Sequence, residues 1–393
     1  MKPEPPFNDP DASRAGLYIH VPFCTSVCPY CDFAVTIAGE ERRAAWTDGV
    51  VREAAMYAGC GLQFDTVYLG GGTPSSLAPQ QLHRILDGLR RHLAITTGAM
   101  LFLEANPEDV TSRNAAEWRG LGFDFVSLGV QSFDDRTLVF LGRRHNGEQA
   151  RQAVETLLAS GLDTLSVDLI YGFDGQTPDS WRKQLDRATT LGAQHLSCYQ
   201  LTFHQGTVFG RRLEEGTMAE YEEDAQAELF FLTHRLLADA GYQGYEVSNF
   251  AAAPHHRSRH NTKYWEHVPY LGLGPSAHSF AAGRRWWNRP KLRLWQRAVS
   301  SGLAPVEDEE RPSPAELAFE AVMLGLRTSA GVDFERFRDR FVVDLLSTNA
   351  MTIDRLSRSG HLFVEGRSLR PTLAGLALAD TIARSLEIGE TDD

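Results

Sequence analysis

The sequence contains no run of eighteen or more apolar residues, so no integral membrane segment is predicted. Its first fifteen residues, "MKPEPPFNDPDASRA", lack the apolar core of a signal peptide, so we expect a cytoplasmic protein. Positive charge is also scarce, because 39 basic residues stand against 51 acidic ones and the net charge is −12. Binding to a polyanion requires a surplus of lysine and arginine, so no nucleic-acid partner is expected.

Cysteine is scarce as well, with five in 393 residues, and an odd count with no spread-out framework argues against a disulfide scaffold. Three of the five fall within eight residues, in "CTSVCPYC", as Cys24, Cys28 and Cys31. In a reducing compartment this concentration predicts metal or catalytic chemistry. The other two, Cys60 and Cys198, are interpreted as thiols that pack as small hydrophobes.

The first part of the chain alternates short β-branched apolar runs with helical segments. The runs are "LYIHVPF" (17–23), "DTVYLGG" (65–71), "LFLEANP" (101–107), "DFVSLGVQS" (124–132), "TLSVDLIYG" (164–172) and "HLSCYQLTF" (195–203). Apolar positions three and four residues apart predict helices over 40–59 and 148–160. This order predicts parallel strands with right-handed crossovers, and hence an α/β core domain over 9–245. We expect an open (β/α)6 partial TIM barrel, with a doubly wound sheet as the alternative.

The pattern changes in the remainder, 246–393, which is predicted to form a smaller α+β C-terminal domain. Its first segment, 246–303, is rich in aromatic residues and histidine and has no clear period. From 304 to 393 we expect helices and a hairpin, and the first of these helices begins with a capping box made by Ser313 and Glu316. Helices with a hairpin are typical of winged-helix modules, but acidic residues outnumber basic ones here, so DNA binding is disfavoured.

The cysteine triad directly follows the first strand and therefore lies at the C-terminal rim, where barrel enzymes place their sites. Structural zinc is normally held by four ligands in two cysteine pairs, and a ferredoxin cluster by four cysteines. Three thiolates on a cubane leave one iron free to bind a small molecule. A zinc site that recruits His20 or Asp32 as its fourth ligand is the alternative.

This C-x-x-x-C-x-x-C spacing after an N-terminal strand, with Tyr30 just before the last cysteine, resembles the signature of radical S-adenosylmethionine (SAM) enzymes. The resemblance implies a 4Fe–4S cluster on Cys24, Cys28 and Cys31, with SAM chelating the open iron. It also implies that Tyr30 contacts SAM, and that an electron from the cluster cleaves SAM to a 5′-deoxyadenosyl radical.

The second strand ends in "GGGTPS" (70–75), where glycines let the backbone approach a ligand closely. No Lys-Ser/Thr follows, so the stretch is not a P-loop. The resemblance implies that Gly71, Gly72 and Thr73 meet the SAM amino group.

Later strands end in polar residues that are costly to bury unless they are paired. Glu104, Gln131 and Asp168 lie on the third, fourth and fifth strands, which predicts one shared polar ligand. By the same resemblance Arg143, in "LGRRHN", forms a bidentate pair with the SAM carboxylate.

Together these residues match the SAM-binding pattern of the oxygen-independent coproporphyrinogen III oxidases and their relatives, from about residue 16 to the C-terminus. This narrower resemblance implies that Tyr18 and Thr202 also touch SAM. Phe33 stands where the oxidases carry a further cysteine, and only about sixteen residues precede the first strand where the oxidases have a longer arm. Both differences favour the haem chaperones of this family over the oxidases.

The motif "HNTKYW" (260–265) resembles the one that the chaperone group associates with haem, which implies haem contacts for His260, Tyr264 and Trp265. A histidine ligand with flanking aromatic rings suits a haem site. One alternative is that His260 orders the aromatic loop. The others are that a nearby histidine binds the iron instead: His255, His256, His267 or His278. "GFDGQT" and "TFHQGT" depart from the family pattern, which usually has Leu-Pro in the first and Glu-Pro in the second.

We therefore expect a haem chaperone that carries the cluster and SAM and delivers haem to respiratory proteins. A reducing partner such as flavodoxin or ferredoxin is implied by the resemblance. The alternative is a radical SAM enzyme, either a coproporphyrinogen oxidase or a methyltransferase.

Overall fold

The computed structural model describes residue 7 and residues 9–388, so the last five residues of the predicted C-terminal domain lie outside it. Its main feature is a 12-stranded sheet with the strand order β12-β11-β10-β9-β1-β2-β3-β4-β5-β6-β8-β7. The six consecutive strands at its centre are parallel: β1 (Ala15–Val21), β2 (Gln63–Gly71), β3 (Ala94–Ala105), β4 (Phe123–Gln131), β5 (Thr164–Tyr171) and β6 (His195–Gln200).

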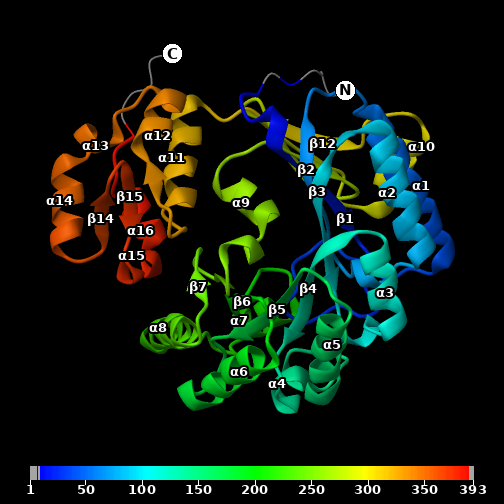
Figure 1. Cartoon of the computed structure of the whole chain (residues 1–393), viewed down its shortest axis with the longest axis horizontal. Helices are drawn as coiled ribbons and strands as arrows, with labels where there is room; N and C mark the ends of the chain where they lie inside the picture. Colours follow the sequence, from blue (N-terminus) through cyan, green and yellow to red (C-terminus); the bar gives the residue numbers. More distant parts are fainter. Residues whose placement is uncertain (1–6, 8, 389–393) are drawn as a thin grey trace.

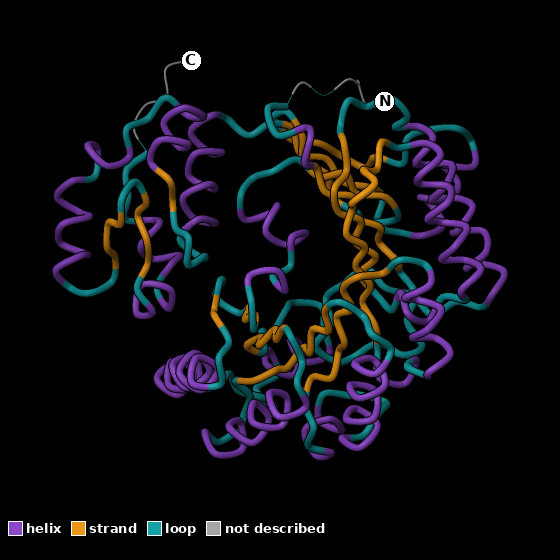
Figure 2. The backbone as a smooth tube through the Cα atoms, viewed as in Figure 1, coloured by secondary structure: helices purple, strands orange, loops and turns teal. Residues whose placement is uncertain are grey.

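Each crossover between these strands carries helices that lie outside the curved sheet (Figure 1). They are α1 (Glu40–Met56), α2 (Pro79–His92), α3 (Ser112–Gly120), α4 (Asp135–Phe140), α5 (Gly147–Ala159) and α6 (Pro178–Leu191). Short 3-10 turns are η1 (Ala12–Arg14), η2 (Pro74–Ser76), η3 (Pro107–Asp109) and η4 (Pro254–His256). The strands follow a curve and do not close into a complete barrel (Figure 2), which confirms the predicted open α/β barrel.

Burial explains why the central strands read as apolar runs. In β5 every residue except Asp168 is buried, because helices cover one face and the barrel interior the other. The main core joins the inner and outer faces of β1–β6 to their helices and includes the large side chains of Trp46, Trp118 and Trp181.

The segment that follows β6 extends this sheet at both edges. Beyond β6 lie β8 (Asn249–Ala251) and β7 (Gln243–Gly244), and beyond β1 lie β9 (Tyr270–Leu273), β10 (His278–Ala281), β11 (Arg284–Asn288) and β12 (Val306–Glu310). The helices of this region are α7 (Val208–Glu214), α8 (Glu223–Asp239), α9 (Arg259–Trp265) and α10 (Leu292–Ser300). The main sheet thus runs past the predicted boundary at residue 245, and 246–303 packs with it.

A buried carboxylate joins the late strands to the first helix. Glu53 of α1 accepts hydrogen bonds from the Gly274 amide (2.8 Å), the Asn288 side chain (2.6 Å) and the Trp295 indole (3.0 Å). Burial raises the pKa of Glu53 to about 8. This carboxylate therefore fastens β11 and α10 to the core.

The C-terminal unit has its own apolar core and a three-stranded antiparallel sheet, β13-β15-β14. Its elements are α11 (Pro314–Gly325), β13 (Val332–Asp333), α12 (Phe334–Phe341), α13 (Leu345–Thr348), α14 (Ala350–Arg358), β14 (Leu362–Glu365), β15 (Ser368–Pro371), α15 (Leu373–Ala377) and α16 (Ala379–Arg384). Ser313 and Glu316 form the predicted capping box, and the predicted hairpin over 361–372 is present. Across the described residues, every helix is too short or too polar to span a membrane.

Candidate radical SAM site

A loop between β1 and α1 carries the cysteine triad, and its base is closed by backbone hydrogen bonds. The Cys24 amide donates to the Thr36 carbonyl (3.1 Å), and the Thr36 amide donates to the Pro22 carbonyl (2.6 Å). Within the loop the Cys31 amide donates to the Cys28 carbonyl (3.1 Å). These bonds present the three thiols from one short, closed segment.

The far side of the loop is held by elements from the other end of the core. The Pro29 carbonyl accepts a hydrogen bond from the Phe209 amide of α7 at 2.9 Å. Gly142 packs so closely on Pro29 that an added Cβ would lie 2.6 Å from the proline ring. The Tyr30 ring packs against Phe209, with 6.3 Å between centroids. Tyr30 thus anchors the loop as well as lining the cavity.

The three thiols line one cavity of about 500 Å³, within the size range of small-molecule sites. Burial raises the pKa of Cys24, and it raises that of Cys31 to about 11. The Thr73 hydroxyl donates to Cys24 Sγ and Arg143 to Cys28 Sγ, each at 3.5 Å. Iron binding displaces thiol protons, and the hydrogen bond from Thr73 favours the thiolate form of Cys24.

The donor set fits a cluster better than a single ion. Across residues 7 and 9–388 no three His, Cys, Asp or Glu side chains converge closely enough to hold one metal ion. A cubane spreads its thiolates over separate iron atoms, which suits three cysteines on an open loop. Cys60 and Cys198 are buried and lie outside the cavity wall, in line with their predicted packing role.

The glycine stretch fastens the cysteine loop to the sheet. The Gly72 amide donates to the Val21 carbonyl and the Thr73 amide to the Phe23 carbonyl, both at 2.8 Å. A Cβ on Gly72 would lie 2.7 Å from the Phe23 carbonyl oxygen, so only glycine fits. These two hydrogen bonds hold the glycine stretch against the start of the cysteine loop.

Two carboxylates line the cavity wall, one from β3 and one from β5. Glu104 accepts from the Tyr68 hydroxyl (2.8 Å) and the Gly71 amide (2.9 Å). Asp168 accepts from the Ser127 hydroxyl at 2.9 Å. The enclosed position raises the pKa of Glu104 to about 7 and that of Asp168 to about 6. A cationic ligand would favour the ionised form of both.

Arg143 is a half-buried cation in the cavity wall, and it links the ends of β3 and β4 to the cysteine loop. Its guanidinium donates to Asn106 Oδ1 (2.6 Å) and the Gly129 carbonyl (2.9 Å), besides Cys28. Its Nε is buried without a partner among the described residues, and a carboxylate can occupy such a donor. Gln131 lines the same cavity. It lies at a bulge in β4, where its own φ of 63° sets the direction of its side chain.

The structure divides the predicted SAM residues into two layers. The cavity wall contains Tyr30, Gly71, Gly72, Thr73, Glu104, Gln131, Arg143, Asp168 and Thr202. Tyr18 is outside that wall, because its hydroxyl contacts His20 Nδ1 at 3.1 Å and its ring stacks on Tyr68. Tyr68 stands between Tyr18 and the cavity.

Sequence reasoning missed several wall residues. Asn106 joins the Thr73 hydroxyl to Arg143, and it lies two residues after Glu104. Ser166, His195 and Ser197 surround Asp168 from β5 and β6. Polar residues spaced two apart inside apolar strands were the available signal, because alternate residues share one face of a strand.

The "HNTKYW" motif forms α9, which lies inside the curve of the sheet (Figure 1). His260 is only 1% exposed, and its two ring nitrogens contact Thr66 Oγ1 and the Tyr264 hydroxyl, both at 2.9 Å. Trp265 packs edge-on against Tyr245. In this arrangement His260 orders the helix, and iron ligation by His260 requires loss of one of these contacts.

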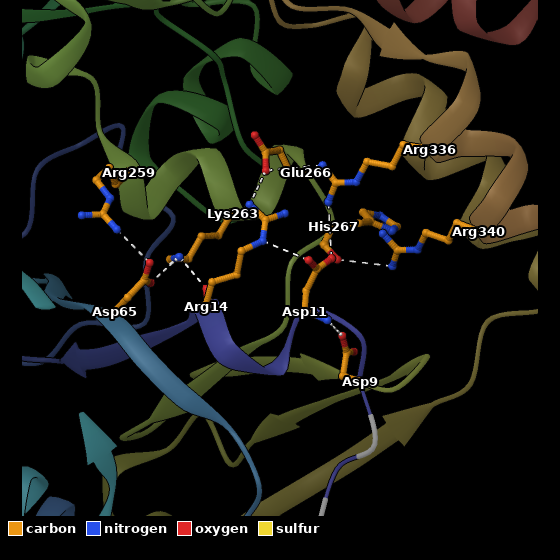
Figure 3. A network of polar contacts seen from close by, with 10 residues as sticks. All are labelled: Asp9, Asp11, Arg14, Asp65, Arg259, Lys263, Glu266, His267, Arg336 and Arg340. Carbon is orange, nitrogen blue, oxygen red and sulfur yellow. Dashed lines mark hydrogen bonds and ion pairs between the residues drawn. The ribbon is translucent and has the colours of Figure 1, made fainter. Parts of the chain in front are cut away.

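A charged network fixes α9 at the open side of the barrel (Figure 3). Asp65 of β2 pairs with Lys263 (2.5 Å) and Arg259 (2.8 Å), and Lys263 also donates to the Arg14 carbonyl (2.6 Å). Arg14 and Arg336 both pair with Glu266 just after α9. The helix is thereby tied to the N-terminal segment, to β2 and to the C-terminal unit.

Fold and cysteine loop together define a radical SAM protein. Residues 18–188 match the model of the radical SAM superfamily, and residues 313–378 match the HemN C-terminal domain. The coproporphyrinogen III oxidase HemN from Escherichia coli, described as a radical SAM enzyme, has the same fold, with a TM-score of 0.79 at 21% identity over 95% of this chain and 90% of that one.

The sequence comparisons define the particular family. The heme chaperone HemW of Mycobacterium tuberculosis is 32% identical over 379 residues, covering 94% of each chain. The heme chaperone HemW of Synechocystis is 35% identical over 325 residues, covering 80% of this chain and 78% of that one. The chain belongs to the HemW family.

Proposed function

We propose that this protein is a haem chaperone that retains a radical SAM site. Its family membership across 94% of the chain carries the proposal, because the relatives matched over that length are named heme chaperones. In this proposal haem is the cargo, and the recipients are respiratory proteins. The cluster and SAM serve the same chain at the cavity described above.

Cys24, Cys28 and Cys31 would hold a 4Fe–4S cluster, and the wall of the cavity would hold SAM. When reduced, such a cluster supplies one electron for cleavage of a sulfonium. Glu104 would accept from a cationic amino group, and the unpartnered Nε of Arg143 would donate to a carboxylate. The Tyr30 ring, packed on Phe209, would shield one side of the cluster loop from water.

Haem binding without turnover tests this proposal. The protein is reconstituted anaerobically with iron and sulfide, and haemin is added at increasing concentration while the Soret band is recorded. We expect saturable binding and transfer of the haem to apomyoglobin. Absence of a saturable Soret change would overturn the chaperone proposal.

The same sample separates the chaperone from the alternative enzyme. Coproporphyrinogen III is supplied with SAM and a reductant such as flavodoxin or ferredoxin, and the products are separated by chromatography. We expect no decarboxylated porphyrin, because Phe33 occupies the position of the further cysteine in the oxidases. Conversion with consumption of SAM would make the oxidase the primary function. We place the protein in the cytoplasm as part of the same proposal.

A further inference from the structure

A histidine with an acidic partner stands at the mouth of the cavity, beside the cysteine loop. His204 follows β6, and its Nδ1 lies 3.6 Å from Oδ2 of Asp32, the residue after Cys31. Both side chains are about half exposed, at 48% and 45%. The cavity mouth therefore carries an accessible imidazole whose Nδ1 faces a carboxylate.

The backbone at His204 is fixed, so the point from which its side chain extends is built into the fold. The His204 carbonyl accepts from the Thr207 hydroxyl at 2.7 Å and from the Thr207 amide at 3.2 Å. Gly210, in the first turn of α7, packs against the same carbonyl so closely that an added Cβ would lie 2.1 Å away. The Phe209 amide then binds the cysteine loop through Pro29. This turn therefore holds His204 and the cysteine loop in one rigid unit.

The pairing of imidazole with carboxylate is the arrangement that orients histidine ligands of metals. A carboxylate at Nδ1 selects the tautomer that leaves Nε2 free to coordinate. Nε2 of His204 makes no hydrogen bond to any described residue, so no internal contact has to be broken.

Comparison of the histidines in the cavity wall singles out this one. His195 and His204 are the two histidines that line the described cavity. His195 is buried, and its ring nitrogens contact the Ser166 and Tyr245 hydroxyls, both at 2.8 Å. His260, in α9, is likewise engaged at both nitrogens. An iron entering this cavity thus meets one free imidazole, that of His204.

The surroundings of His204 suit a flat, apolar macrocycle with acidic edges. Val27 and Phe33 line the same cavity from the cysteine loop and are 52% and 58% exposed, although exposure of apolar side chains costs free energy. Such exposed apolar groups at a cavity mouth are typical of ligand sites. Arg144, exposed in the same wall, can pair with a carboxylate such as a propionate.

We infer that His204 is the axial ligand of haem iron at the mouth of the SAM cavity, and that Asp32 is its positioning residue. This inference rests on the proposed haem binding, and it identifies the residue that ligates the iron and the position of the haem site. It concerns this chain's own residues, because "HQGT" replaces the Glu-Pro usual at this point in the resembled family. Haem held by His204 would lie beside the cysteine loop.

The test is a haemin titration of the reconstituted full-length protein and of four variants. In His204→Ala we expect an altered Soret band and release of haem to apomyoglobin that is faster by about tenfold or more. Added imidazole should restore the wild-type band, because it replaces the missing ligand. Asp32→Asn should shift the band and weaken binding by about tenfold.

His83→Ala is the matched control, because His83 is also an exposed histidine next to an aspartate (Asp87, 3.0 Å) but lies on α2 outside the cavity. His255→Ala tests an exposed histidine elsewhere, at η4. Both should reproduce the wild-type spectrum. Iron and sulfide content and SAM binding, measured on each variant, report whether the fold and the cluster are intact.

The outcomes separate the two levels of the proposal. If the wild type binds no haem, the chaperone proposal fails. If the wild type binds haem and His204→Ala gives the same spectrum and release rate, haem binding stands and the ligand assignment is overturned. A changed spectrum in His255→Ala but not in His204→Ala would move the ligand to η4.

Discussion

Replacement of Arg143 by methionine tests the SAM site most directly. The guanidinium makes two short hydrogen bonds, to Asn106 Oδ1 and to the Gly129 carbonyl, and its Nε is left for a ligand. A hydrogen bond to a charged group is worth about 1.5–3 kcal/mol. Since 1.4 kcal/mol is a factor of ten, Arg143→Met should weaken SAM binding by about 10- to 100-fold.

The same change should also destabilise the protein. It leaves the Asn106 and Gly129 oxygens without their donor, and an unsatisfied buried acceptor costs about 1–3 kcal/mol. Water in the cavity can replace part of this loss, so we expect the lower end, about 2 kcal/mol for the pair. Asn106→Ala should weaken SAM binding less, because Asn106 acts through Arg143.

The assay is isothermal titration of SAM into anaerobically reconstituted protein, with iron content measured on each sample. Arg144→Met is the matched control, because Arg144 is the adjacent arginine in the same wall but is exposed. Its SAM affinity should stay within about twofold of the wild type, as for other exposed charges. Superimposable titrations for Arg143→Met and wild type at equal iron content would refute the assignment of Arg143.

Three further expectations concern the cluster, pH and the network around α9. Cys28→Ala should abolish the iron of the reconstituted protein and Cys198→Ala should not, as colorimetric iron analysis will check. SAM affinity should rise as pH increases through about 7, because only ionised Glu104 attracts a cation, and a flat profile would contradict this role. Without SAM the effect of Glu104 on stability has the opposite sign. The folded protein keeps the Glu104 proton up to about pH 7, whereas the unfolded chain loses it near pH 4.5. The free energy of unfolding should therefore decrease as pH rises from about 4.5 to about 7, as chemical denaturation will check. Asp65→Ala should lower the free energy of unfolding by about 3 kcal/mol, because it leaves the buried lysine of α9 without its carboxylate counter-ion. Asp179→Ala, in an exposed pair, should change it by less than about 0.5 kcal/mol.

The sequence predicted the parallel core well, because strands buried on both faces read as continuous apolar runs. It also placed the cavity residues near strand ends, where parallel topology brings their side chains together. Tyr18 is the exception, since its position one layer below the cavity depends on Tyr68 of the neighbouring strand. Contacts across strands are not visible in a local pattern.

The late part of the sheet could not be predicted in the same way. Strands β9 and β10 have four residues each, too few for an alternating pattern to stand out. Helix α9 has seven residues and contacts polar and aromatic groups on several sides, so it shows no apolar stripe of the usual period. The free imidazole of His204 needed the fold as well, because Asp32 is far from it in sequence.

The placement of α9 inside the barrel has a consequence for synthesis of the chain on the ribosome. Thr66 meets His260 across 194 residues, and His195 contacts the hydroxyl of Tyr245, which is translated 50 residues later. Translation proceeds at about 5–20 residues per second, so His260 is made on the order of 10–40 s after Thr66. The nascent six-stranded sheet therefore lacks the partner of Thr66 until α9 has been translated. We expect it to become resistant to protease only after the segment through Trp265 has left the exit tunnel.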